Sequence, residues 1–209
     1  MRISCASLVR IVTTDGRLAL LVNKNGRKQG LTVLAPLGGA TEVDATLGRQ
    51  IMSQLNLTDA DFDKPPTDTM DLRFAVDDAL VDEVRRSFLS WDSGPEREIR
   101  EELVDETGIL TQAELNAGCR GLTFVGVSEE QAVSTRTGKA AGQTTLRLIS
   151  VYDLSCRAEM TEKLEAAAHG SDPQVYFVTP AEIEAGRTES GVEIATISKS
   201  LLHPSPAFN

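Results

Sequence analysis

The stretch "EREIREELVDETGIL", residues 96–110, carries six carboxylates within what its periodicity predicts to be a single helix. At 100° per residue, Glu98, Glu102 and Asp105 lie within about 60° of one another on that helix. The carboxylates that flank this strip are Glu101 and Glu106. An apolar face beside the strip, formed by Ile99, Leu103 and Leu110, predicts that the helix packs on a sheet and presents its acidic strip along one edge.

The charge balance of this helix is unfavourable. Like charges four residues apart cost about 0.2–0.5 kcal/mol per pair, and the helix dipole disfavours Asp105 and Glu106 in the last turn before Gly108. The local cations, Arg97 and Arg100, both precede that turn. One interpretation is a solvent-exposed acidic face. The other is a bound Mg²⁺, with Mn²⁺ as an alternative ion, because hard divalent cations prefer carboxylate oxygens and keep sites for phosphate and water.

The composition narrows the classes of function. The chain has 209 residues, of which 41% are hydrophobic and 25% charged, as expected for one globular domain spanning residues 1–209. A net charge of −10 opposes binding to long nucleic acid, but a small anionic substrate remains compatible if a cation carries it. Two histidines exclude a histidine-rich metal site, and three cysteines without CxxC spacing favour reduced thiols. No apolar run predicts a membrane span or secretory signal, so we expect a cytoplasmic protein.

The first part of the chain is predicted to form an antiparallel sheet. Runs rich in β-forming residues at 3–12 and 18–25 are separated by Asp15-Gly16, a hairpin signal. A third strand, Leu31 to Leu34, leads into a Pro-x-Gly-Gly loop.

Residues 45–94 are predicted to form a structured insertion. It contains a weak helix at 46–56, a polar loop at 58–69, and a helix starting near Asp77. The apolar stripe of that last helix consists of Leu80, Val84, Phe88 and Trp91.

Strands and short helices are predicted after the acidic helix. A long polar loop at 129–143 is expected between two strands. The remaining expected elements are strands at 121–128, 144–154 and 174–178 and helices at 161–169, 180–186 and 191–202, with Thr179 as the cap of the second of these helices.

The end of the quoted stretch resembles a known motif. "EELVDETGI", residues 101–109, is similar to the end of the Nudix box, G-x(5)-E-x(7)-R-E-U-x-E-E-x-G-U, where U is apolar. "PLGGATE", residues 36–42, resembles the loop that opens the box, and "VYFVTPAEIEAG", residues 175–186, resembles the family's late strand and short helix. The resemblance implies a Nudix α/β/α sandwich with a mixed sheet, an insertion at 45–94 within the box, and a homodimer.

The match departs from the family pattern at two positions. Glu101 stands where the box has arginine, and Ala45 stands where it has glutamate. We expect Arg97 or Arg100 to replace the arginine, and Glu98 to add a carboxylate. The segments "DLRFAVDD" and "SFLSW" resemble Nudix proteins encoded beside bacterial nucleotide-signalling antiviral systems.

The resemblance also implies roles for individual residues. Glu102, Asp105 and Glu106 become metal ligands, with the Gly39 carbonyl completing the site and Glu98 as an additional ligand. Glu102 and Glu106 would also be catalytic, through a metal-bound water that attacks a diphosphate or triphosphate. The candidates for a general base are Glu129 and Glu130, which otherwise simply begin a polar loop.

Four residues are candidates for substrate binding. Arg136 and Lys139 would contact phosphates from the polar loop, Arg73 would clamp a phosphate, and Phe74 would stack on a base. The implied activity is Mg²⁺-dependent hydrolysis of a nucleoside triphosphate or another nucleoside diphosphate derivative, releasing a nucleoside monophosphate and pyrophosphate. The alternatives are a noncatalytic Nudix module that binds a nucleotide or a protein partner, and an enzyme that cleaves capped or dinucleoside polyphosphates.

Overall fold

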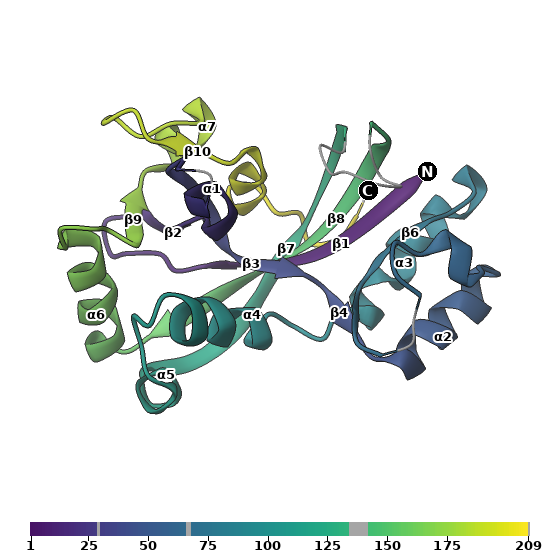
Figure 1. The fold of residues 1–209 in the computed structure, drawn as a ribbon, viewed down its shortest axis with the longest axis horizontal. Helices are drawn as coiled ribbons and strands as arrows, with labels where there is room; N and C mark the ends of the chain where they lie inside the picture. The colour runs from purple at the N-terminus through teal and green to yellow at the C-terminus, as the bar shows by residue number, and fades with distance from the viewer. Residues whose placement is uncertain (29, 66–67, 134–141, 209) are drawn as a thin grey trace.

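A computed structural model of the chain describes residues 1–28, 30–65, 68–133 and 142–208. Its centre is a mixed sheet with the strand order β7-β8-β1-β3-β2-β9 (Figure 1). The pair β1 and β8 is parallel, and the other neighbours along this order are antiparallel. The strands are β1 (Arg2–Arg10), β2 (Leu18–Val22), β3 (Val33–Ala40), β7 (Cys119–Val133), β8 (Thr144–Cys156) and β9 (Val175–Val178).

Short strands extend this arrangement. β6 (Arg73–Ala75) pairs with β1, and β10 (Glu193–Ile194) pairs with β3. A separate two-stranded ribbon joins β4 (Glu42–Val43) to β5 (Met70–Asp71).

The first turn is confirmed, and Val12 pairs antiparallel with Leu18 directly beside it. Gly16 has a φ of +81°, and the Thr13 amide donates to the Arg17 carbonyl at 2.9 Å. The main parts of β1 and β2 are nevertheless separated by β3, which pairs antiparallel with both. The predicted hairpin is therefore confined to the residues next to the turn, because β3 takes the central position between the main parts of the two strands.

Helices cover both faces of the sheet. Alternation along β1 sends Val9 and Ile11 into one core, together with Ile99 and Leu103, and sends Leu8 into another. The first face is covered by α4 (Glu96–Arg100), the π-helical segment η3 (Glu101–Glu106), α5 (Gln112–Gly118) and α6 (Ala158–His169). The second face is covered by α7 (Pro180–Ala185) and the 3₁₀ helix η5 (Thr196–Leu201), with α1 (Lys24–Lys28) following β2. This α/β/α layering agrees with the expected sandwich (Figure 1).

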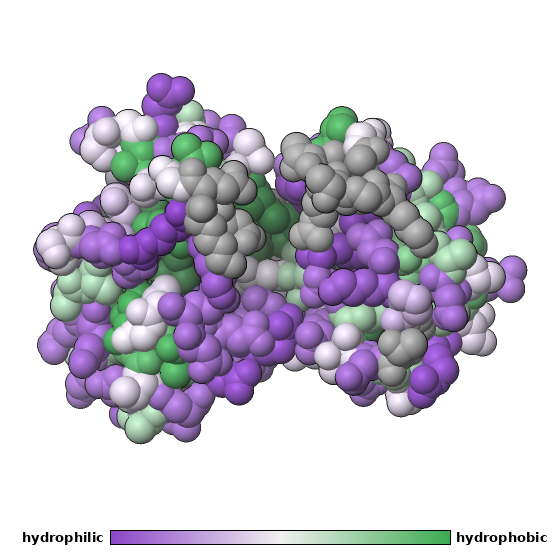
Figure 2. Space-filling view, in the orientation of Figure 1, coloured by the Kyte–Doolittle hydropathy of each residue, from purple (hydrophilic) through white to green (hydrophobic). Residues whose placement is uncertain are grey.

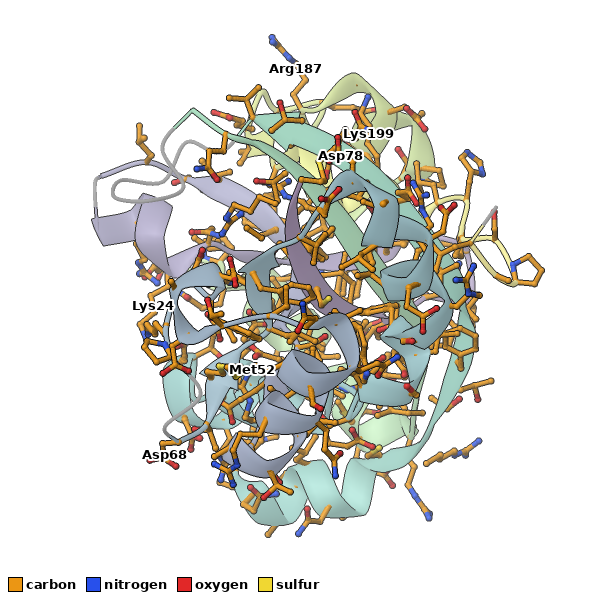
Figure 3. The ribbon with its side chains drawn as sticks, turned by 90° about the vertical axis from the view of Figure 1, so that its right-hand side faces the viewer. Lys24, Met52, Asp68, Asp78, Arg187 and Lys199 are labelled. Carbon is orange, nitrogen blue, oxygen red and sulfur yellow. The ribbon has the colours of Figure 1, made fainter. Side chains whose placement is uncertain are left out.

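The described residues between 45 and 94 form helices and short strands that share a core with the sheet. Val84, Phe88 and Trp91 of the predicted stripe are buried beside Ile3 of β1. The helices of this region face the viewer in Figure 3, where Met52 marks the first of them. They are α2 (Ala45–Leu55), η1 (Asp59–Asp61), η2 (Asp78–Leu80) and α3 (Val81–Trp91).

Four local expectations need correction. The strand expected at Leu31 to Leu34 is β3, which begins at Val33 and continues through the predicted Pro-x-Gly-Gly loop to Ala40. Phe74 is fully buried and packs against Phe62 and Trp91, so its ring is part of the core and cannot stack on a base. The predicted loop at 129–143 begins later, because β7 continues to Val133 in register with β8. The predicted helix at 191–202 consists of β10 followed by η5.

Two further features concern the cysteines and the possibility of a membrane-spanning helix. Cys5, Cys119 and Cys156 are all free thiols. Within the described ranges, no helix has both the length and the apolar character needed to cross a bilayer.

Candidate functional site

The acidic helix widens where its carboxylates are densest. α4 continues into η3, and the Thr107 amide donates to the Glu102 carbonyl five residues earlier, at 3.2 Å. The Thr107 hydroxyl donates to the same carbonyl at 2.7 Å. Ile99 and Leu103 are buried and hold the helix against the sheet. Single π-helical turns of this kind occur often at functional sites, and this one carries Glu102 and Glu106.

The helix meets the sheet at an open edge of β3. β2 pairs with β3 only as far as Pro36, so the later part of that edge is not covered by β2. There the Gly38 amide donates to Oε2 of Glu102 at 2.9 Å. Gly38 has a φ of +125°, and a Cβ on it would overlap the Ser7 carbonyl oxygen. Only glycine permits this close approach of the strands.

Gly39 leaves room for a second carboxylate. A Cβ at this position would lie 2.5 Å from Oε2 of Glu98, closer than van der Waals contact allows. The glycine pair therefore brings the backbone of β3 against both Glu98 and Glu102.

Arg97 is the local counter-ion of the cluster. Its guanidinium forms an ion pair with Glu98, donates to Glu101 at 3.0 Å and lies 3.6 Å from Glu42. It also donates to the Ala40 carbonyl at 3.3 Å. Burial lowers the pKa of Arg97, but the neighbouring carboxylates outweigh that effect and raise it. Arg97 thus ties the helix to the segment that follows the glycine pair.

Glu102 is the most perturbed acid in this cluster. Burial raises the pKa of Glu102 to about 8, although the Gly38 hydrogen bond lowers it, and Glu98, Glu106 and Glu101 raise it further. Burial likewise raises the pKa of Glu98, although Arg97 opposes the shift. Burial and mutual repulsion therefore disfavour the charged forms of these carboxylates, and a positively charged ligand would favour them.

A groove of about 380 Å³ runs along the open edge. Glu102 and Glu106 line it from the helix, and Asn23 and Lys24 line it from the end of β2. Nζ of Lys24 lies 2.5 Å from Oε1 of Glu106, and the side chains are 55% and 34% exposed, so this pair stands at the mouth of the groove. We call this cavity the acidic groove. Lys24 and Asn23 were missed by the sequence analysis, because nothing in their local pattern marks the end of β2 as a site.

The geometry suggests a second way to align the box. Arg97-Glu98-Ile99-Arg100-Glu101-Glu102 reads as R-E-U-x-E-E without a mismatch, so the box arginine is present as Arg97. Both alignments share Glu102, but here Glu102 is the last glutamate of the box, so Gly108 follows that glutamate by six residues where the box pattern has two. The additional residues lie in the widened turn η3. Asp105, a ligand in the first alignment, is 55% exposed and lies 3.7 Å from Arg100.

The proposed general bases have other partners. Glu129 forms two hydrogen bonds of 2.8 Å with Arg85 of α3, and Glu130 lies 3.0 Å from Arg147 of β8. Neither side chain lines the acidic groove.

Two other expected substrate contacts, Arg136 and Lys139, lie outside the described residues. Arg73 forms an ion pair with Asp71 and lines a separate cavity on the other face of the sheet.

The residues of the cluster fit a divalent cation by their chemistry. Glu98, Glu101 and Glu102 supply carboxylate oxygens at i, i+3 and i+4 of one helix, next to a backbone cradle that a Cβ at Gly39 would fill. Over the described part of the chain, no three His, Cys, Asp or Glu side chains converge closely enough to hold a metal. Instead, Glu98 and Glu101 form ion pairs with Arg97, and Glu106 forms one with Lys24. Ion binding would require these pairs to open.

The raised pKa of Glu102 predicts a pH-dependent stability in the metal-free protein. Its pKa is about 8 in the folded state, against an ordinary value of 4.5 for a solvated glutamate, so the folded state binds more protons between these values. Stability should therefore fall as pH rises from about 5 to 8, by about 2 kcal/mol or more. Urea unfolding in EDTA at pH 5.5 and pH 8 measures the fall. A Glu102→Gln variant with the same pH slope as the unmodified chain would show that Glu102 is not its cause.

Comparison with known proteins identifies the family of this chain. The chain matches the family model described as the SMODS-associated NUDIX domain over residues 1–202. No curated protein matches it. This match covers nearly the whole chain and agrees with the mixed sheet, the flanking helices and the carboxylate helix at the glycine pair. The chain therefore belongs to the SMODS-associated NUDIX domain family.

Proposed function

We propose that the chain is a Mg²⁺-dependent hydrolase that cleaves a phosphoanhydride bond in a nucleotide. The observation that carries this proposal is the contact of Glu98 and Glu102 with the Gly38-Gly39 backbone, beneath an arginine at the box position. A noncatalytic scaffold does not need partly buried carboxylates with raised pKa values at this point. Their cost in stability is understandable if a cation binds there.

Glu98, Glu101 and Glu102 are the proposed metal ligands, together with the Gly39 carbonyl. The ion would supply a water of lowered pKa and would neutralise charge on the phosphoryl oxygens. Arg97 holds Glu98 and Glu101 in the absence of that ion.

Glu106 and Lys24 are proposed to act on the substrate side of the groove. Both line the cavity, and their ion pair lies at its mouth. A phosphate that enters would compete with Glu106 for the Lys24 ammonium. Glu106 would then be released to accept a proton from the attacking water, while Lys24 would bind a phosphoryl oxygen.

The substrate proposed first is a nucleoside triphosphate, cleaved to a nucleoside monophosphate and pyrophosphate. Capped and dinucleoside polyphosphates contain the same linkage and belong in the same assay. A noncatalytic module that binds a nucleotide or a protein partner is the second candidate, and it is favoured by the engagement of the carboxylates with Arg97 and Lys24.

A panel of these nucleotides should show release of phosphate or pyrophosphate that depends on Mg²⁺ or Mn²⁺. Within the same panel, Glu101→Gln and Asp105→Asn distinguish the two alignments of the box. We expect Glu101→Gln to lower kcat/KM by at least about a hundredfold, because a ligand is worth several kcal/mol in the transition state. Asp105→Asn should change kcat/KM by less than about threefold, since its side chain is 55% exposed and faces Arg100.

The opposite ranking would restore Asp105 as the ligand. Absence of release from every nucleotide with either ion would favour the noncatalytic module.

A further inference from the structure

A second cavity, of about 420 Å³, lies on the other side of β3 from the acidic helix. Ser4, Ala6 and Leu8 of β1 line it, whereas Ile3 and Val9 of the same strand pack into the other cores. Figure 2 shows a hollow between the part of the molecule that carries α1 and β10 and the part that carries β1 and β8. We call this cavity the arginine pocket, because Arg2, Arg73 and Arg147 line it.

The arginine pocket adjoins the acidic groove at the open edge of β3. The residues that line both cavities are Asn23, Ala35, Pro36 and Gly38. A ligand held by its diphosphate in the acidic groove can therefore extend over Gly38 into the arginine pocket.

The sheet register builds the arginine pocket. Arg73 of β6 and Arg147 of β8 lie directly opposite Ser4, one on each side. Neighbouring strands are about 4.8 Å apart, so the two arginine backbones flank the small serine at about 10 Å from one another. Arg2 lies on the same face two residues earlier, and its side chain is only 5% exposed. It donates to Oγ1 of Thr145 at 2.9 Å.

Carboxylates hold each arginine in place. Arg2 pairs with Asp63, Arg73 with Asp71, and Arg147 with Glu130 at 3.0 Å. Among the described residues, Arg147 donates to Glu130 through Nη1 alone. Because a guanidinium carries five N–H donors in a planar fork, an arginine held on one edge can bind an anion with another.

The lining favours a phosphate over a stacked base. No aromatic side chain from the described part of the chain lines the arginine pocket, and the nearby Phe74 is buried beneath the sheet. The chain as a whole has a net charge of −10, and at this cavity three arginines balance the three carboxylates that pair with them. Planar guanidinium groups are the side chains best matched to phosphate oxygens.

We propose that the arginine pocket binds a second phosphate group, on the ribose side of the nucleotide whose diphosphate is cleaved in the acidic groove. The substrate class is then a nucleotide that carries a 2′- or 3′-phosphate in addition to its 5′-polyphosphate. This inference rests on the proposed function for the identity of the ligand, but it can be tested without any turnover.

The test compares nucleoside 5′-monophosphates with their 2′- and 3′-phosphorylated counterparts, for all four bases, by calorimetry in Mg²⁺. These compounds contain no phosphoanhydride, so they are not hydrolysed. For at least one base, the second phosphate should tighten binding at least tenfold. Arg147→Gln should reduce this preference to within twofold, and Arg147→Lys should give an intermediate value, because it keeps the charge but loses the fork.

Arg187→Gln is the matched control. Arg187 is exposed, lines none of the cavities described above, and points away from the molecule in Figure 3. This variant should retain the full preference. Thermal unfolding verifies that each variant is folded, and Arg73→Gln replaces Arg147→Gln if the latter is not.

Equal affinity for both members of every pair would overturn the inference, as would a preference that persists in the folded arginine variants. The arginines would then be ion pairs of the sheet only. A phosphate preference without hydrolysis of any nucleotide would contradict the proposed function and leave the arginine pocket intact.

Discussion

Replacing Glu102 by glutamine is expected to lower kcat/KM for the best nucleotide by at least about a thousandfold. Glu102 is the carboxylate shared by both alignments of the box, and it accepts a hydrogen bond from Gly38 at the open edge of β3. The same change also removes a buried carboxyl group. Burial raises the pKa of Glu102 to about 8, which means that its charged form is unfavourable at this position. The metal-free variant should therefore be more stable than the original chain at pH 8, although it is inactive. Steady-state kinetics and urea unfolding in EDTA measure the two effects.

Glu96→Gln is the control for this experiment. Glu96 belongs to the same helix but is exposed at its start, so activity and stability should stay close to those of the original chain. An active Glu102→Gln enzyme, with kcat/KM reduced by less than tenfold, would remove Glu102 from the catalytic site.

Gly38→Ala is expected to destabilise the protein by about 3 kcal/mol and to abolish activity. The φ of +125° at Gly38 strains any other residue, and the added Cβ would overlap the backbone of β1 at Ser7. The strands β1 and β3 would have to separate at the point where Glu102 is held. Chemical unfolding measures the loss of stability, and circular dichroism verifies that the remaining fold is native.

Gly16→Ala provides a matched comparison, because Gly16 also has a positive φ, of +81°, but nothing lies within 4 Å of an added Cβ. Its cost should be about 1 kcal/mol, from backbone strain alone. Equal costs at the two positions would mean that the close approach at Gly38 does not matter.

Local sequence patterns predicted much of the architecture. The periodicity of Val84, Phe88 and Trp91 correctly identified the buried face of α3, and Thr179 caps α7 as expected. The acidic helix was also predicted, with its apolar face on the sheet, because that signal is local in the sequence.

Features that depend on strand pairing could not be predicted in the same way. The position of β3 between β1 and β2 is a choice among pairings that the local pattern does not distinguish. The arginine pocket joins Arg2, Arg73 and Arg147 from three strands, and only the register brings them together. Nothing near these residues in the sequence predicts that they share a cavity.

The alignment of the box illustrates another limit. Gly108 is a clear helix-end residue. When it is aligned with the glycine of the box, Asp105 and Glu106 fall at the positions of the two box glutamates. The widened turn of η3 separates Gly108 from Glu102, and single-residue patterns do not reveal such a turn. Contacts of Glu98 and Glu102 with the glycine pair provide the missing information.

Calorimetric titration of the metal-free protein with Mg²⁺, alone and with a nonhydrolysable nucleotide, tests the central claim most directly. We expect saturable ion uptake by the original chain and by Glu96→Gln, and none by Glu102→Gln. Absence of uptake by the original chain under both conditions, or equal uptake by Glu102→Gln, would contradict the assignment of this carboxylate helix as a metal centre.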